Sequence, residues 1–107
     1  MVEKLNANGH RRRQVRARVL AEEDACALCG QLVDKTVPYP DAMSAVVDED
    51  IPRIRGGSQY DRQNTVLMHS ACNRWKWKMT LAEAKAKLAN DKNGRKAAKT
   101  VVASPIW

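Results

Sequence analysis

The chain has 107 residues, a formal net charge of +7 and three cysteines. This length suits one domain with a small core, and such domains often need a disulfide or a metal for stability. The odd number of cysteines excludes a complete disulfide framework, and no apolar run is long enough for a transmembrane helix. The polar, basic N-terminus lacks the apolar core of a secretory signal, so we expect a cytoplasmic protein.

Basic residues are concentrated in two parts of the chain, residues 1–18 and residues 74–99. Between them lies a group of acidic residues, namely Asp41, Asp48, Glu49 and Asp50. This distribution is typical of a protein that binds a polyanion and holds a cation between itself and its partner. A solvated basic surface explains the same charges, and the charge alone does not separate the two interpretations.

The first half of the chain is expected to contain one helix. Residues 1–9 are interpreted as a flexible lead-in segment. Residues 10–23 have the apolar spacing of an amphipathic helix whose remaining circumference carries arginines. A tight Cys-Ala-Leu-Cys-Gly turn follows, and residues 31–44 contain two prolines, which indicates an irregular loop.

The second half is expected to contain a hairpin and two helices. Short β-favouring runs at residues 45–47 and 65–68 predict two strands joined by a long loop. A helix is expected over residues 70–79, and the capping-box spacing of Thr80 and Glu83 predicts another that ends near Asn90. A single domain would therefore span residues 10–90, and residues 91–107 are interpreted as a tail. Because the chain has no Phe, we expect at least one of Trp75 and Trp77 in the core.

Two pairs of metal-binding residues share one spacing, Cys26-x2-Cys29 and His69-x2-Cys72. Zinc takes four such ligands in a tetrahedron, and two residues separated by two others can face one ion from a knuckle or a helical turn. The sequence therefore predicts one structural zinc ion, with no open position for a substrate. A redox pair or two buried thiols would explain Cys26 and Cys29 alone, but neither explains the second pair.

Several further motifs occur in a fixed order along the chain. They are Val47-Asp48-Glu49-Asp50-Ile51-Pro52, Arg55-Gly56-Gly57, Asn64 and His69-x2-Cys72-Asn73-Arg74-x-Lys76. In this order they resemble the HNH endonuclease family, in its cysteine-bearing branch, over about residues 15–79. Pro38-Tyr39-Pro40-Asp41 and Met43-Ser44 are similar to small bacteriophage members. The resemblance implies an α+β fold: a treble-clef-like ββα-metal core with a structural zinc, flanked by basic helices.

The resemblance also implies a role for each matched residue. Asp48 and Asn73 would bind a catalytic divalent cation, and Asn64 would brace the loop and orient the base. Glu49 stands where the family usually has the histidine that activates water. A glutamate is a weaker base than a histidine of pKa about 6.5, unless burial or neighbouring carboxylates raise its pKa.

Strand geometry leaves two other interpretations of this segment open. Alternate residues of a strand share a face, so Asp48 and Asp50 would converge while Glu49 points away. Both aspartates would then bind the metal, and Glu49 would be exposed. The third interpretation is a solvated acidic turn that forms no site.

The function implied by the resemblance is a Mg²⁺- or Mn²⁺-dependent endonuclease that hydrolyses DNA phosphodiester bonds. It implies phage origin and a DNA-packaging terminase as partner, with no membrane association and no organic cofactor. The candidate phosphate contacts are Arg53, Arg55, Arg74 and Lys76, the last two being equally well explained as helix surface charge. Two alternatives remain: a zinc-stapled DNA-binding module that lost cleavage with the missing histidine, and a thiol redox protein using Cys26 and Cys29.

Overall fold

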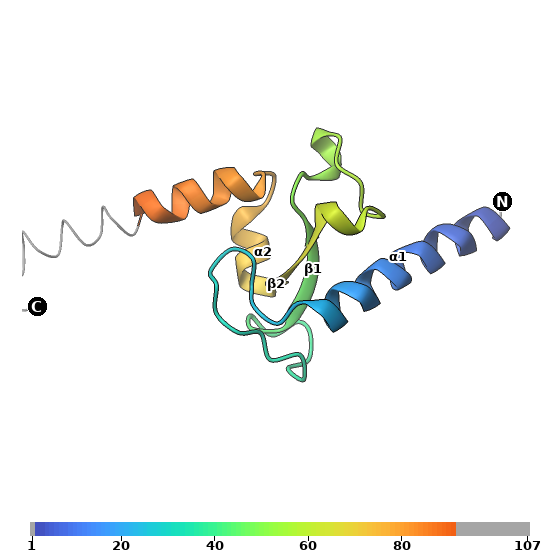
Figure 1. Ribbon diagram of the computed structural model, residues 1–107, viewed down its shortest axis with the longest axis horizontal. Coiled ribbons are helices and arrows are strands. Elements are labelled where there is room, and N and C mark those ends of the chain that lie inside the picture. The colour runs from blue at the N-terminus through green and yellow to red at the C-terminus, as the bar shows by residue number, and fades with distance from the viewer. Residues whose placement is uncertain (1, 92–107) are drawn as a thin grey trace, which may run out of the picture.

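The computed structural model describes residues 2–91, which form an α+β fold with a two-stranded sheet at its centre (Figure 1). The elements run in the order α1 (Val2–Glu22), β1 (Ala45–Glu49), β2 (Thr65–His69) and α2 (Ser70–Lys76). A further helix, called here the C-terminal helix, occupies residues 81–91. The two predicted strands are confirmed, and each extends slightly beyond its β-favouring run. No helix within residues 2–91 is both long enough and apolar enough to cross a membrane.

The antiparallel register of the hairpin decides which residues share a face of the sheet. Ala45 pairs with His69 at one end, and Glu49 pairs with Thr65 at the other. Paired residues point to the same side, and successive residues alternate. Val47, Glu49 and their partners therefore lie on the face toward α1, whereas Asp48 lies on the face toward α2.

The long connection between the strands contains two short 3-10 turns, η1 (Arg53–Arg55) and η2 (Arg62–Asn64). Arg62 joins this connection to the end of α1, because its Nε lies 2.8 Å from Glu22 Oε1 and its Nη2 lies 2.8 Å from Glu23 Oε2. Glu23 also accepts a hydrogen bond from the Leu67 backbone nitrogen at 3.0 Å. This network fixes the end of α1 against β2.

The N-terminal helix begins earlier than its apolar spacing predicts. α1 begins at Val2, so the expected start at residue 10 is wrong, and the expected lead-in segment is helical from that residue. Residues 2–9 contain no proline and several good helix formers, so nothing in them stops the helix from extending beyond its packed end. The predicted tail lies outside the described residues from position 92 onward.

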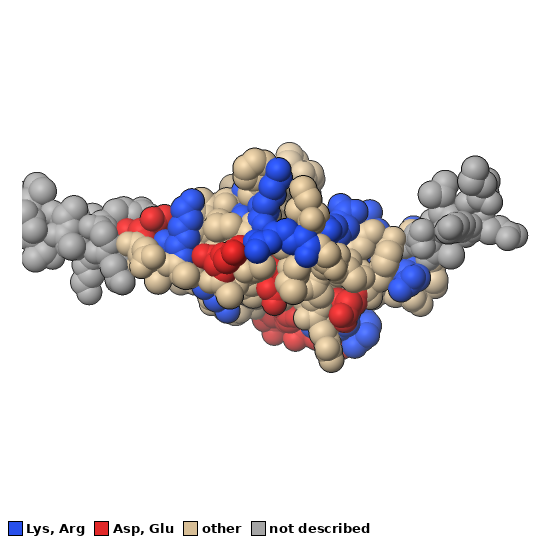
Figure 2. All heavy atoms as spheres, turned by 90° about the horizontal axis from the view of Figure 1, so that it is seen from above, with Lys and Arg blue, Asp and Glu red and all other residues tan. Residues whose placement is uncertain are grey.

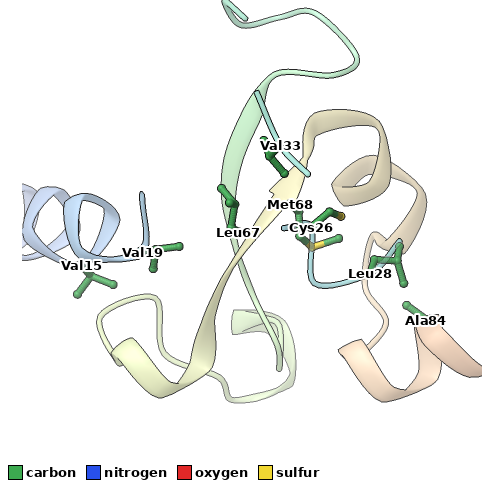
Figure 3. Packing of buried hydrophobic residues seen from close by; sticks show 8 residues of the cluster. All are labelled: Val15, Val19, Cys26, Leu28, Val33, Leu67, Met68 and Ala84. Carbon is green, nitrogen blue, oxygen red and sulfur yellow. The ribbon is translucent and has the colours of Figure 1, made fainter. Parts of the chain in front are cut away.

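The core is small and lies on both sides of β2 (Figure 3). In Figure 3, Val15 and Val19 of α1 lie on one side of this strand and Leu28 and Ala84 on the other. The buried apolar side chains are Val15, Val19, Cys26, Leu28, Val33, Leu67, Met68 and Ala84. Because so few apolar side chains are buried, we expect polar contacts and metal ligands to contribute much of the stability of this fold.

Trp75 and Trp77 do not enter this core, so the expectation that one of these two is buried is wrong. Trp75 is 37% exposed and Trp77 is 72% exposed, whereas Lys76 between them is fully buried. The residue that α2 buries is therefore Lys76, which is held by polar contacts, and not either of the larger tryptophans beside it. Trp77 ends the helix with a φ of 50°, which explains why α2 stops short of the predicted residue 79.

Candidate metal centre and adjoining polar site

The four predicted zinc ligands form one cluster, with ligand atoms of Cys26, Cys29, His69 and Cys72 all within 4.8 Å of one another. The Nδ1 atom of His69 lies 3.4 Å from Cys29 Sγ and 4.0 Å from Cys72 Sγ. A tetrahedral zinc ion with Zn–S of about 2.3 Å and Zn–N of about 2.0 Å separates its ligand atoms by about 3.5–3.8 Å. The residues therefore fit one zinc ion in both chemistry and spacing.

Two separate parts of the fold supply these ligands. Cys26 and Cys29 lie on a tight turn closed by a 2.9 Å hydrogen bond from Gly30 N to Cys26 O, and Gly30 adopts a φ of 80° there. A backbone bond of 2.9 Å from Ala27 N to Leu67 O attaches this turn to β2. His69 is the last residue of β2, so the cluster holds the turn to the junction between strand and helix.

The histidine is oriented by a second contact. His69 Nε2 lies 3.1 Å from the carbonyl oxygen of Leu32, which fits donation from this nitrogen. That tautomer leaves Nδ1, the atom facing the thiols, free to bind a metal. Leu32 is itself held by a bridge to Ala25, directly before the cysteine turn.

The three thiols are free and influence one another. Burial opposes ionisation of Cys26, but backbone N–H groups of Cys29 and His69 outweigh it and lower its pKa to about 7. Burial, followed by the charge of Cys26, raises the pKa of Cys72 to about 12. Without a metal, the three thiols do not all ionise together, because a thiolate at Cys26 opposes ionisation of Cys72. A divalent cation bound among them would stabilise all three thiolates.

The second predicted cluster lies on the α2 face of the hairpin, where Asp48 and Asn73 meet. With the Asn73 amide nitrogen turned toward Asp48, the N···O distances are 3.0 and 3.1 Å to the two carboxylate oxygens. Lys76 Nζ lies 3.1 Å from Asp48 Oδ2 and donates to the backbone oxygen of Glu49 at 2.7 Å. Lys76 has no exposed surface, so its predicted role as a phosphate contact is wrong.

Glu49 points to the opposite face from Asp48, as strand alternation requires. Its side chain is 18% exposed, and Arg53 Nε lies 3.4 Å from Oε1. Burial, and then the neighbouring charge of Asp48, raises the pKa of Glu49, while Arg53 opposes the rise. These are the conditions under which a glutamate becomes a better proton acceptor near neutral pH.

Asn64 braces the loop that follows β1. Its Oδ1 accepts a hydrogen bond from Ile51 N at 2.9 Å, and its Nδ2 donates to Ile51 O at 3.0 Å and Ser58 O at 3.1 Å. Gly57 leaves the space for this contact, because a Cβ there would lie 1.6 Å from Ile51 O. The structure therefore places Asn64 as a brace of the backbone two residues after Glu49.

The other acidic and basic candidates near the hairpin have partners of their own. Asp50 Oδ1 accepts from Leu81 N at 3.2 Å, at the start of the C-terminal helix. Arg55 forms an ion pair with Glu83, whose pKa is lowered to about 2 by that contact. Glu83 also completes the predicted capping box, with 2.9 and 3.2 Å bonds to and from Thr80. Arg74 remains exposed, with Ser70 Oγ at 3.4 Å.

A cavity next to Glu49 was not predicted from the sequence. This cavity of about 230 Å³ lies between α1 and the end of the hairpin, and Glu49 lines it together with Arg12, Arg13 and Arg16. The sequence signal was present, because these arginines flank the buried Val15 on one helix. Their position relative to Glu49 depends on how α1 packs on the sheet, which the sequence pattern does not specify.

Comparisons of this chain with protein-family models, curated proteins and solved structures found no match. The functional argument therefore depends on the residues and on the geometry described above.

Proposed function

We propose that this protein is a metal-dependent DNA endonuclease of the HNH type. The proposal rests on one observation: Asp48 of β1 and Asn73 of α2 lie side by side where the helix packs on the hairpin. The Asn73 carboxamide group lies 3.0–3.1 Å from the Asp48 oxygens. Neighbouring oxygen ligands of an octahedral Mg²⁺ with Mg–O of about 2.1 Å are separated by about 3.0 Å. With its oxygen facing Asp48, Asn73 would therefore complete a pair of adjacent cation ligands.

The chain's own residues divide the chemistry among them. Asp48 and Asn73 would hold Mg²⁺ or Mn²⁺, which when bound supplies charge stabilisation at the phosphate. Glu49 ends β1 and points to the α1 face, so its carboxylate, with its raised pKa, would have to reach past the end of the strand toward Asp48 to accept the proton of the attacking water. Asn64 would keep the backbone after Glu49 in place, so that the carboxylate has a defined direction.

A specific observation favours a second candidate, a zinc-stapled DNA-binding module without cleavage. The buried ammonium group of Lys76 already lies against Asp48, with both side chains largely withdrawn from solvent. A resident cation in this position neutralises the carboxylate without a divalent ion. In this alternative, the polar site stabilises the fold, and the basic surfaces bind DNA.

Plasmid nicking by the zinc-loaded protein distinguishes the two candidates. We expect the wild type to nick supercoiled plasmid with Mg²⁺ or Mn²⁺, and Asp48→Asn to lose at least about 100-fold in rate, since it removes a ligand charge. Asp91→Asn, an exposed acid on the C-terminal helix, is the matched control and should retain full activity. DNA binding without nicking in either metal would establish the binding module instead, and equal nicking by Asp48→Asn would reject Asp48 as the cation ligand.

A further inference from the structure

The cavity beside Glu49 has an unusual charge distribution. Its charged and polar lining consists of Arg12, Arg13, Arg16, Glu49, Gln59 and Thr65. Its apolar lining comes from Val15 and Val47, which attach α1 to the α1 face of the hairpin. Three arginines thus line a space of about 230 Å³, and Glu49 is the only acid among the lining residues that the structure describes.

The three arginines have no internal role that accounts for them. Among residues 9–91, whose side chains the structure describes, no carboxylate lies within ion-pair distance of Arg12, Arg13 or Arg16. By contrast, Arg18 and Arg62 have glutamate partners. All three are exposed, and Figure 2 shows basic side chains continuing along the α1 arm of the molecule. Arginines that line one cavity without acidic partners favour an anionic ligand.

Two further features lie at or next to this cavity. Gly9 lies in its lining, inside a helix where glycine costs about 0.5–1 kcal/mol relative to alanine. A Cβ at Gly9 would lie 3.4 Å from Arg13 Nη1, an ordinary van der Waals contact, so the Arg13 guanidinium group lies beside this glycine. Arg11 of α1 stacks 4.5 Å from the ring centroid of Tyr60, which holds the residue next to Gln59 against α1.

We propose that this cavity is a binding site for a backbone phosphate of duplex DNA, with Arg12, Arg13 and Arg16 as its ligands. Guanidinium groups bind phosphate oxygens through paired N–H donors, and the Gln59 amide adds a neutral donor. The proposal rests on the proposed function for its choice of DNA, and it deepens that function by placing a neighbouring phosphate of the strand on the α1 side of the end of β1, across the hairpin from the Asp48–Asn73 pair. Glu49 repels a phosphate at close range, so the arginines must supply the net attraction.

Binding of a fluorescent DNA duplex, measured in EDTA-free buffer without Mg²⁺ or Mn²⁺ and with zinc loaded, tests this site separately from cleavage. The test variant is R12Q/R13Q/R16Q, which keeps good helix formers at exposed positions. The matched control is K78Q/K85Q/K87Q, which removes the same charge from exposed positions after α2 and on the C-terminal helix. Circular dichroism confirms that both variants fold.

We expect the test variant to lose at least about tenfold in affinity near 100 mM salt and to reduce the slope of log K against log salt by about three. The control should lose much less affinity, and inorganic phosphate at millimolar concentration should compete with DNA for the wild type more than for the test variant. Equal losses in both variants, an unchanged test variant, or no binding by the wild type would overturn the proposal. Binding that depends on the arginines without plasmid nicking would retain this site and reject the nuclease.

Discussion

The buried ion pair between Lys76 and Asp48 makes a sharp prediction for stability. Lys76→Met keeps most of the side-chain volume but removes the ammonium group that contacts Asp48 and the Glu49 carbonyl. Removing one member of a buried pair costs about 3–5 kcal/mol, because the remaining charge loses its partner. Asp48 keeps 16% side-chain exposure and its contact with Asn73, so we expect about 3 kcal/mol.

Urea unfolding followed by circular dichroism, with zinc in excess, measures this loss. The double variant D48A/K76M removes both charges, so its loss should be smaller than the sum of the two single variants by about 2 kcal/mol. Lys85→Met, at an exposed position of the C-terminal helix, should change the free energy of unfolding by less than about 0.5 kcal/mol. A neutral Lys76→Met variant, or strictly additive losses in the double variant, would refute the argument that this pair stabilises the fold.

Three further predictions concern the zinc cluster, the braced loop and the base. Removing zinc with a chelator, or replacing Cys29 with Ser, should unfold the domain, because a structural zinc contributes about 10–16 kcal/mol and the whole free energy of unfolding of a domain is about 5–15 kcal/mol. Circular dichroism with metal analysis checks this, and an unchanged melting temperature after proven zinc loss would contradict it. Gly57→Ala should lower the free energy of unfolding by about 2–4 kcal/mol, because its Cβ would overlap Ile51 O. Gly56→Ala meets open space and should cost only about 1 kcal/mol, for its left-handed backbone. Urea unfolding compares the two variants, and equal losses would reject the packing explanation. Glu49→Gln should abolish nicking yet strengthen DNA binding a few-fold, because among the described residues it removes the only acid that lines the arginine cavity. Retained nicking in the plasmid assay would exclude Glu49 as the base.

Local spacing was enough to predict several parts of this molecule. The matched Cys-x2-Cys and His-x2-Cys pairs specified the ligand cluster, since each pair is positioned by one turn of backbone. The β-favouring runs specified both strands, and the spacing of Thr80 and Glu83 specified the start of the C-terminal helix. Strand alternation also indicated that Asp48 and Glu49 lie on opposite faces.

Features that depend on long-range packing were not predictable in this way. Lysine is ordinarily exposed, so the burial of Lys76 follows only once the hairpin brings Asp48 and the Glu49 carbonyl to α2. The same contact turns Trp75 and Trp77 outward, against the expectation from their size. The position of the α1 arginines beside Glu49 likewise depends on how the helix packs on the sheet, which no spacing in the sequence specifies. The extension of α1 to Val2 follows instead from residues 2–9 containing no proline.

Cys72 and Asn73 are neighbours in α2, so a residue of the candidate zinc cluster directly precedes the one proposed to bind the catalytic cation. Stripping the zinc would therefore displace Asn73 from Asp48 even if no other ion were involved. Inhibition by a strong chelator would then reflect the loss of the zinc that supports the fold as well as the loss of the catalytic Mg²⁺ or Mn²⁺. Activity after complete metal removal should return only when zinc is restored first and Mg²⁺ or Mn²⁺ second, which makes the order of addition itself informative.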